Sequence, residues 1–178
     1  MSGLKRTVAL IGMMGAGKST VGRRLASRLR TPFFDADIEI EAAAGCTINE
    51  IFARFGESEF REGERRVILR LLALEPHVLA TGGGAVLDVA TRARISENAV
   101  SVWLRAPLEL LLARVERRDT RPLLHGGNMR EKLTRLLAER EPLYAQADIV
   151  VDAGDGPHWI AVERILEALA SKGHLNEP

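Results

Sequence analysis

The sequence predicts an α/β fold in which helices cover both faces of a parallel β-sheet. Short apolar runs alternate along the chain with longer amphipathic segments, and this order is typical of parallel sheets. A glycine-rich loop joins the first apolar run, residues 7–11, to the first helical segment, residues 18–30. With 178 residues, of which 46% are hydrophobic, the chain is expected to form one domain, residues 1–178, with a sizeable core.

Five runs are predicted to be strands because each is short, apolar and bounded by residues that interrupt regular structure. They are residues 7–11, 33–35, 77–81, 99–104 and 147–152. Apolar residues at helical spacing predict the helices that connect them. The predicted helices are residues 18–30, 37–44, 47–55, 58–73, 88–95, 107–116, 129–144 and 157–170.

Several helix ends carry residues that begin or stop helices. Gly45 follows the second helix and Gly56 follows the third, as glycine often does at a helix C-terminus. Thr47 and Glu50 have the spacing of a capping box, and Pro107 stands at the start of a later helix. Residues 116–128 are charged and weakly periodic, which predicts a mobile loop, and residues 173–178 are expected to be a frayed tail.

Composition narrows the classes of function. A formal charge of +1, from 25 basic and 24 acidic side chains, argues against a general affinity for nucleic acid or membranes. No apolar run approaches the roughly 18 residues of a membrane span, and no signal-peptide region precedes the first strand. The single cysteine, Cys46, excludes an internal disulfide and is interpreted as a small residue on a helix face. We therefore expect a cytoplasmic protein, and we also expect a monomer.

The glycine-rich loop is the strongest functional signal. Residues 12–20 read Gly-Met-Met-Gly-Ala-Gly-Lys-Ser-Thr and fit G-x-x-x-x-G-K-[ST] between a strand and a helix. The alternative, a chance match in a loop that contains glycine, is disfavoured by this setting. Backbone N–H groups and the helix N-terminus suit a triphosphate, with Lys18 on the β- and γ-phosphates and the Ser19 hydroxyl on Mg²⁺. The other residues of the predicted nucleotide site are Gly15, Ala16, Gly17 and Thr20.

Two carboxylates, Asp35 and Asp37, follow the second strand. In extended chain, residues two apart point to the same side, so both can face a site at the carboxyl end of the sheet. A phosphoryl-transfer enzyme of this kind needs an acid near its metal, and the third strand ends in Thr81-Gly82 without one. Asp35 is therefore the candidate ligand of the metal or of a metal-bound water. Asp37 either accepts a proton from a substrate hydroxyl or only caps the following helix.

Glycines and arginines supply further candidates. Gly82, Gly83 and Gly84 suit a ligand pressed against the backbone, and a plain tight turn is the alternative. Arg121 lies in the charged loop and fits the role of a cation that neutralises a transferred phosphoryl group. Pattern alone does not separate the other arginines from solvated surface residues. The four histidines show no metal-binding spacing, so a zinc site is unsupported.

Six segments occur together and in order over residues 7–170. They are the phosphate-binding loop, Asp35-x-Asp37, Phe60-Arg61-x-x-Glu64, Gly82-Gly83-Gly84-Ala85-Val86, Arg121-Pro122-Leu123-Leu124 and Arg140-x-Pro142-Leu143-Tyr144. This set resembles the shikimate kinase family. The loop is shared by many nucleotide-binding families, whereas the last three segments are far more specific and exclude most other small kinases.

The resemblance implies a three-layer P-loop fold of the nucleoside-monophosphate-kinase type, with a five-stranded parallel sheet. It also implies a helical substrate-binding segment near residues 37–65 and a mobile lid near residues 116–128. The implied reaction is ATP-dependent phosphorylation of the 3-hydroxyl of shikimate, a step of aromatic amino-acid biosynthesis, with ATP and Mg²⁺ as cofactors.

The resemblance also assigns roles to residues. Asp37 would bind shikimate hydroxyls and act as the base, and Arg61 and Arg140 would hold the carboxylate. Gly83, between Gly82 and Gly84, would contact the substrate, and Arg121 would reach the phosphates. A small anionic polyol does need bidentate cations for its carboxylate and an acceptor for its hydroxyls, so the physical reasoning agrees.

For adenine, the resemblance implies contacts from Arg118 or Arg117 and from residues 154–157, including Pro157. Asp155 stands where the family often has Arg or Gln, which leaves that side-chain contact open. Two other functions remain alternatives. Another small-molecule kinase, such as a gluconate kinase, should lack the Arg-Pro-Leu-Leu segment. A non-catalytic nucleotide-binding protein should lack Asp37, Arg61 and Arg140, all of which are present.

Overall fold

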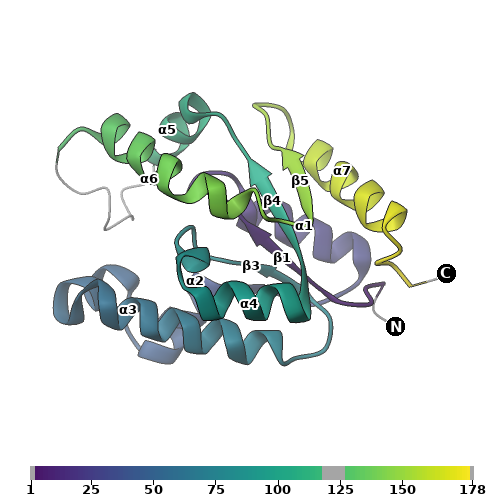
Figure 1. Ribbon diagram of the computed structural model, residues 1–178, viewed down its shortest axis with the longest axis horizontal. Coiled ribbons are helices and arrows are strands. Elements are labelled where there is room, and N and C mark those ends of the chain that lie inside the picture. The colour runs from purple at the N-terminus through teal and green to yellow at the C-terminus, as the bar shows by residue number, and fades with distance from the viewer. Residues whose placement is uncertain (1–2, 118–126, 177–178) are drawn as a thin grey trace.

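The computed structural model describes residues 3–117 and 127–176. Within them the chain forms one five-stranded sheet in the order β2-β3-β1-β4-β5, and every neighbouring pair of strands is parallel (Figure 1). The strands are β1 (Thr7–Ile11), β2 (Phe33–Asp35), β3 (Val78–Ala80), β4 (Ala99–Arg105) and β5 (Ile149–Asp152). The predicted α/β class and its five parallel strands are confirmed.

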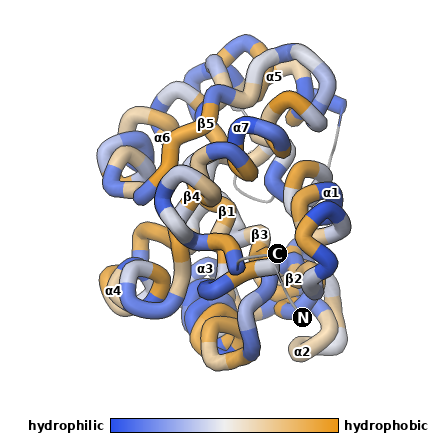
Figure 2. Tube along the Cα trace, turned by 90° about the vertical axis from the view of Figure 1, so that its right-hand side faces the viewer, coloured by the Kyte–Doolittle hydropathy of each residue, from blue (hydrophilic) through white to orange (hydrophobic). Residues whose placement is uncertain are grey.

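Helices cover both faces of this sheet. They are α1 (Lys18–Leu29), α2 (Ala36–Ala44), α3 (Ile48–Leu72), the short 3-10 helix η1 (Ala85–Leu87), α4 (Val89–Asn98), α5 (Leu108–Glu116), α6 (Met129–Tyr144) and α7 (His158–Ser171). Helices α1 and α7 pack against each other, whereas α4 packs on β4 and α3 packs on α4. Figure 2 shows the strands between α1 on one side and α4 and α6 on the other, with hydrophilic and hydrophobic residues alternating along the helices. No helix within the described residues is long and apolar enough to span a membrane.

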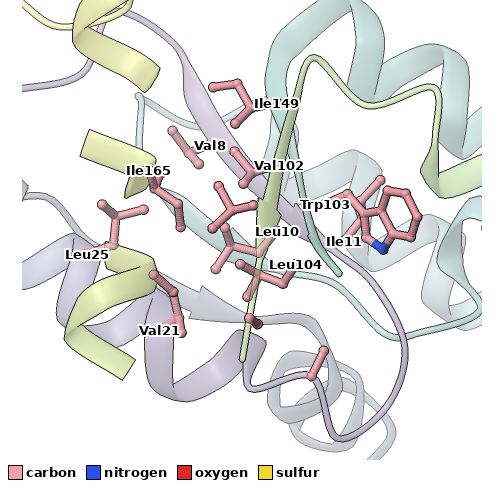
Figure 3. Packing of buried hydrophobic residues seen from close by; sticks show 14 of the residues in the cluster. Val8, Leu10, Ile11, Val21, Leu25, Val102, Trp103, Leu104, Ile149 and Ile165 are labelled. Carbon is pink, nitrogen blue, oxygen red and sulfur yellow. The ribbon is translucent and has the colours of Figure 1, made fainter. Parts of the chain in front are cut away.

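The central strands have no polar face, because helices lie on both sides of them. All five residues of β1 are buried, and Val8 to Ile11 form the continuous apolar run expected of a parallel strand between two helical layers. Figure 3 shows Val21 and Leu25 of α1 and Ile165 of α7 directed at Leu10 and Leu104. Burying each such side chain contributes about 1.5–3 kcal/mol, so this packing holds the first strand and the loop that follows it in place.

The structure corrects the prediction for the acidic pair at the end of β2. Helix α2 begins at Ala36, one residue earlier than predicted, so Asp37 lies in its first turn and not in extended chain. Asp35 is the N-cap, and its side chain accepts a hydrogen bond of 3.0 Å from the backbone N–H of Asp37. Aspartate is among the best N-caps because its oxygen satisfies a free N–H of the first turn. Asp35, and not Asp37, therefore caps this helix.

Three other predicted boundaries have instructive outcomes. Gly56 interrupts the helical geometry with φ 82° and ψ 176°, so the predicted break is present as a kink inside α3. The capping box of Thr47 and Glu50 is confirmed. The prediction of a frayed tail is wrong for residues 173–176. Leu175 forms an antiparallel bridge with Leu4, and the N–H of Asn176 donates to the carbonyl oxygen of Gly3. Of the predicted lid, residues 118–126 lie outside the described residues.

Candidate functional site

Two adjoining cavities open at the carboxyl ends of the strands. The first, which we call the loop cavity, has a volume of about 280 Å³ and borders the phosphate-binding loop. The second, which we call the cleft, has a volume of about 450 Å³ and lies between that loop and helices α2, α3 and α6. Both cavities are lined by Ser19, Thr20, Asp35, Asp37, Gly82 and Gly83. A group bound in one cavity can therefore reach a group bound in the other across this shared wall.

The loop has a backbone geometry that requires glycine. Gly12, Gly15 and Gly17 have φ values of 141°, 82° and 96°, which residues with a side chain rarely adopt. This path leads directly into the N-terminus of α1, where Lys18 is the first helical residue and is buried. The Lys18 ammonium group donates to the carbonyl oxygens of Gly12 at 2.7 Å and Met13 at 2.9 Å. The ammonium group is therefore held at the loop, where it can bind phosphate oxygens.

Ser19 and Asp35 form the pair that suits a magnesium ion. The Ser19 hydroxyl donates to Oδ2 of Asp35, which brings two oxygen groups together in the wall shared by the cavities. No cluster of three or more His, Cys, Asp or Glu side chains that could hold a metal occurs among the residues that the structure describes. Mg²⁺ commonly uses one or two protein oxygens together with waters and substrate phosphates, so this sparse donor set fits Mg²⁺.

Arg140 is the most unusual side chain of the cleft. It is only 1% exposed, and its Nε and Nη1 have no hydrogen-bond partner among the described residues. Its Nη1 is 3.1 Å from where a Cβ on Gly83 would stand, so the glycine turn leaves room for the guanidinium. Buried polar groups normally find partners, and two unpartnered donors at a cavity wall indicate a place for an anion.

Tyr144 fixes the glycine turn from the other side. Its hydroxyl donates to the carbonyl oxygen of Gly83, and its ring lies 5.9 Å from the ring of Trp103, centroid to centroid. Burial raises the pKa of Tyr144 to about 12, although the nearby charge of Arg140 opposes that change. Tyr144 is therefore a neutral donor at physiological pH, and it joins α6 to the turn after β3.

Arg61 and Glu64 form an ion pair one helical turn apart at the other side of the cleft. Nη1 of Arg61 donates to Oε1 of Glu64 at 2.8 Å, while Nη2 lies 3.4 Å from Glu57. Burial raises the pKa of Glu64, whereas the charge of Arg61 lowers it and that of Asp37 raises it. Oε2 of Glu64 has no partner among the described residues. Like Arg140, this group is buried at the cavity with unused hydrogen-bonding capacity.

The side chain of Asp37 lies over the glycine turn. A Cβ on Gly82 would stand 3.2 Å from Oδ1 of Asp37 and 2.7 Å from Oε2 of Glu64. A Cβ on Gly84 would stand 2.6 Å from Cζ of Arg61. The turn thus brings the carboxylates and the guanidinium against bare backbone, which is a closer approach than a plain tight turn requires.

Most predicted site residues lie at the two cavities. The loop cavity is lined by Gly15, Gly17, Lys18, Ser19 and Thr20, and the cleft is lined by Asp37, Arg61, Gly82, Gly83, Gly84 and Arg140. Ala16 is buried within the loop and lines neither cavity, and neither does Pro157. Arg118 and Arg121 lie outside the described residues.

Sequence reasoning overlooked two residues of the loop cavity. Arg114 of α5 donates to the carbonyl oxygens of Gly15 at 3.1 Å and Ala16 at 3.3 Å. His158, the first residue of α7, lies against Gly17. Arg114 occupies an ordinary position of an amphipathic helix, and no local pattern distinguishes it. His158 follows Pro157, so the predicted adenine loop was one residue from the side chain that lines the cavity.

Comparison with known proteins places the chain in a family. The family model for shikimate kinase matches residues 14–170. A shikimate kinase of Caulobacter vibrioides is 59% identical over 164 residues, which are 92% of this chain and 82% of the relative. One of Nitrobacter winogradskyi is 61% identical over 161 residues, which are 90% of this chain and 75% of the relative.

The fold agrees with these relatives. The structure of a shikimate kinase from Acinetobacter baumannii in complex with shikimate has a TM-score of 0.92 and 40% identity, and covers 94% of each chain. A gluconokinase from Sinorhizobium meliloti shares the fold alone, with a TM-score of 0.66 and 20% identity over 95% of this chain and 94% of that one. On the family match, the identities and the fold, this chain belongs to the shikimate kinase family.

Proposed function

We propose that this chain transfers the γ-phosphoryl group of ATP to the 3-hydroxyl of shikimate, giving shikimate 3-phosphate and ADP. The observation that carries the proposal is the wall shared by the two cavities. It places a phosphate-binding loop and a buried arginine cleft on either side of Asp35 and Asp37. Phosphoryl transfer needs such an arrangement, because the nucleophile and the γ-phosphorus must meet in line.

In the proposed reaction the 3-hydroxyl oxygen attacks the γ-phosphorus, and the bond from phosphorus to the bridging oxygen of ADP breaks. Asp37 accepts the hydroxyl proton. Lys18 neutralises charge on the transferred group, and Arg121, outside the described residues, is proposed to do the same. Mg²⁺ held by Ser19 and Asp35 would supply further charge neutralisation on the phosphates.

Shikimate is proposed to bind in the cleft through its carboxylate and hydroxyls. Arg140 offers two donors that have no partner within residues 3–117 and 127–176, and Arg61 stands across the glycine turn with its guanidinium held by Glu64. Together they provide the planar, bidentate donors that a carboxylate prefers. The backbone of the Gly82–Gly84 turn and the Asp37 carboxylate are proposed to contact the ring hydroxyls.

ATP is proposed to bind in the loop cavity, with its phosphates on the N–H groups of residues 15–20. Arg114, which donates to the carbonyl oxygen of Gly15, is proposed to bind the nucleotide as well, and Arg117 also lines this cavity. The proposed contacts of Arg118 and Pro157 with adenine remain to be tested by substitution. The chain is further proposed to act as a monomer in the cytoplasm, where its cysteine, Cys46, would stay a free thiol. Light scattering of the purified protein tests the oligomeric state.

An assay of ADP release tests the proposed reaction directly. ATP and Mg²⁺ are supplied with shikimate, with quinate or with gluconate in parallel. Shikimate should support turnover, and both other acceptors should give rates near the background. Quinate has a carboxylate on a similar ring, so it tests the hydroxyl contacts, while gluconate tests the alternative kinase. Faster ADP release with gluconate than with shikimate would contradict the proposal.

A further inference from the structure

The loop cavity contains an imidazole to which the proposed reaction assigns no role. His158 is half-buried at the start of α7. Its ring lies against the phosphate-binding loop, since a Cβ on Gly17 would stand 3.2 Å from Cε1 and 3.4 Å from Nδ1. Nη1 of Arg114 approaches the same point to 3.6 Å. The imidazole therefore borders the space into which the loop N–H groups point.

The described charges that act on this ring are cations. Burial lowers the pKa of His158, and the charges of Arg114 from α5 and Arg24 from α1 lower it further. The N-terminus of α7 adds partial positive charge beside the ring. The imidazole is therefore neutral at pH 7 in the absence of ligand. The other charged residues that line the loop cavity are Lys18, Asp35, Asp37 and Arg117.

Phosphate groups would reverse this electrostatic balance. A nucleotide brings several negative charges to the loop, and an anion close to an imidazole favours its protonated form. The nucleotide phosphates would also contact Lys18 and Arg114. Their negative charge would offset the repulsion between the arginine and a protonated ring. Further burial of the ring opposes protonation, but the ring is already half-buried before the ligand arrives.

We propose that His158 is a nucleotide-binding residue that takes up a proton when phosphates enter the loop cavity. The inference rests on the proposed function, because it takes the ligand of this cavity to be a nucleotide. The protonated ring donates to a phosphate oxygen and adds a third cation to Lys18 and Arg114. Nucleotide affinity should therefore rise as the pH falls, by more than the titration of the nucleotide itself explains.

A proton NMR titration of the imidazole Cε1–H signals tests this proposal on the full chain. The signals are followed between about pH 5 and pH 9, with and without ADP and Mg²⁺. The His158 signal is assigned by its absence from the spectrum of His158→Gln, and His174 serves as the control imidazole. ADP should raise the pKa of His158 by about one unit, which corresponds to about tenfold tighter ADP binding to the protonated form. The His174 signal should not respond to ADP.

Calorimetry of ADP binding supplies the second measurement. The ratio of affinities at pH 6 and pH 8 should be smaller in His158→Gln than in the unmodified chain, by up to about tenfold. The titration of ADP is common to both proteins and cancels in this comparison. If ADP binds but the pKa of His158 is unchanged or falls, the proposal is overturned while the proposed function stands. If the variant keeps the full ratio, the proposal is equally overturned. Failure of the unmodified chain to bind ADP would overturn both.

Discussion

The loop cavity and the cleft both present cations to an anion, but they differ in how those cations are satisfied without ligand. At the loop, Lys18 donates to the carbonyl oxygens of Gly12 and Met13, and Arg114 donates to those of Gly15 and Ala16. In the cleft, two nitrogens of Arg140 have no hydrogen-bond partner in the part of the chain that the structure describes. Glu64, beside Arg61, has an unpartnered oxygen among the described residues.

This difference separates stability from specificity. The cations at the loop can exchange carbonyl partners for phosphate oxygens. They therefore have hydrogen-bond partners both in the empty protein and in the nucleotide-bound protein. An unsatisfied buried group costs about 1–3 kcal/mol, so the cleft lowers the stability of the empty protein. The right anion recovers that energy, and an acceptor without a carboxylate does not. The cleft should therefore control which substrate binds, while the loop should control the rate of transfer.

Replacing Lys18 by Met should have the largest effect and should fall on turnover alone. Loss of one preorganised charge at a transferring group lowers the rate by about 10²–10³-fold or more. The melting temperature and shikimate affinity should hardly change, because the lysine donates to loop carbonyls and does not line the cleft. Steady-state kinetics and calorimetry measure this, with the exposed Lys172→Met as control. Turnover within tenfold of the original would contradict the role of the loop.

Replacing Arg140 by Met should mainly reduce shikimate affinity. Truncating one side of a buried charged contact typically costs about 2–5 kcal/mol of binding free energy, and ATP affinity should stay constant. The empty variant should be as stable as the original or more so, because it lacks a buried guanidinium of which two nitrogens have no partner among the described residues. Arg135→Met, an exposed position on the same helix, is the control. A large drop in melting temperature would show that Arg140 is a structural residue instead.

Replacing Gly84 by Ala should have a moderate effect confined to the cleft. Gly84 has a φ of −96°, which alanine adopts easily, but its new methyl group would meet the guanidinium of Arg61. We expect shikimate affinity to fall about tenfold, or about 1.4 kcal/mol, with unchanged ADP affinity. Gly63→Ala is the control, since nothing lies within 4 Å of its Cβ position in α3. It should stabilise the helix by about 0.5–1 kcal/mol and leave binding unchanged.

Replacing Glu64 by Gln should give the smallest effect, seen in the pH dependence of stability. Burial raises the pKa of Glu64 in the folded protein, so the folded state holds its proton more tightly than the unfolded state does. The stability of the original protein therefore falls as the pH rises from the unfolded pKa, about 4.3, through the raised folded pKa. Glutamine lacks this loss, so the variant gains relative stability as the pH rises.

The gain for Glu64→Gln should be at most about 1 kcal/mol, because glutamine keeps only a weaker hydrogen bond to Arg61. Melting curves at about pH 4 and pH 7 measure the relative change. Glu59→Gln, at an exposed position of α3, should show no such trend. A difference between variant and original that does not depend on pH would mean that Glu64 titrates normally, and the contrast with the loop would be weaker than the structure indicates.

The fold is predictable from this sequence to the level of its elements, because the central parallel strands are mostly apolar. Residues 7–11 are an example, since all five are buried. The start of α2 is not predictable from periodicity, since Asp35 both ends β2 and caps the helix through its hydrogen bond from the Asp37 N–H. The bridge between Leu4 and Leu175 joins opposite ends of the chain, and no local pattern contains it.

The candidate site is predictable where a sequence motif determines the backbone conformation. The prediction fails where the packing of helices brings a side chain to the site. The loop backbone has positive φ values that favour glycine, so the glycines in the sequence indicate this backbone geometry. Arg114 and His158 reach the loop cavity only because α5 and α7 pack beside it. Tyr144 stands in a specific motif, yet its bond to Gly83 depends on how α6 crosses the turn after β3.

The bridge between Leu4 and Leu175 brings the two ends of the described chain together where β1 begins, as Figure 1 shows. Both cavities lie at the opposite end of the strands, at their carboxyl ends. A surface tether or a fusion partner at either end should therefore leave substrate entry open. A short peptide joining the ends would also permit a circular permutant, opened at the exposed turn of Leu74 and Glu75 between α3 and β3.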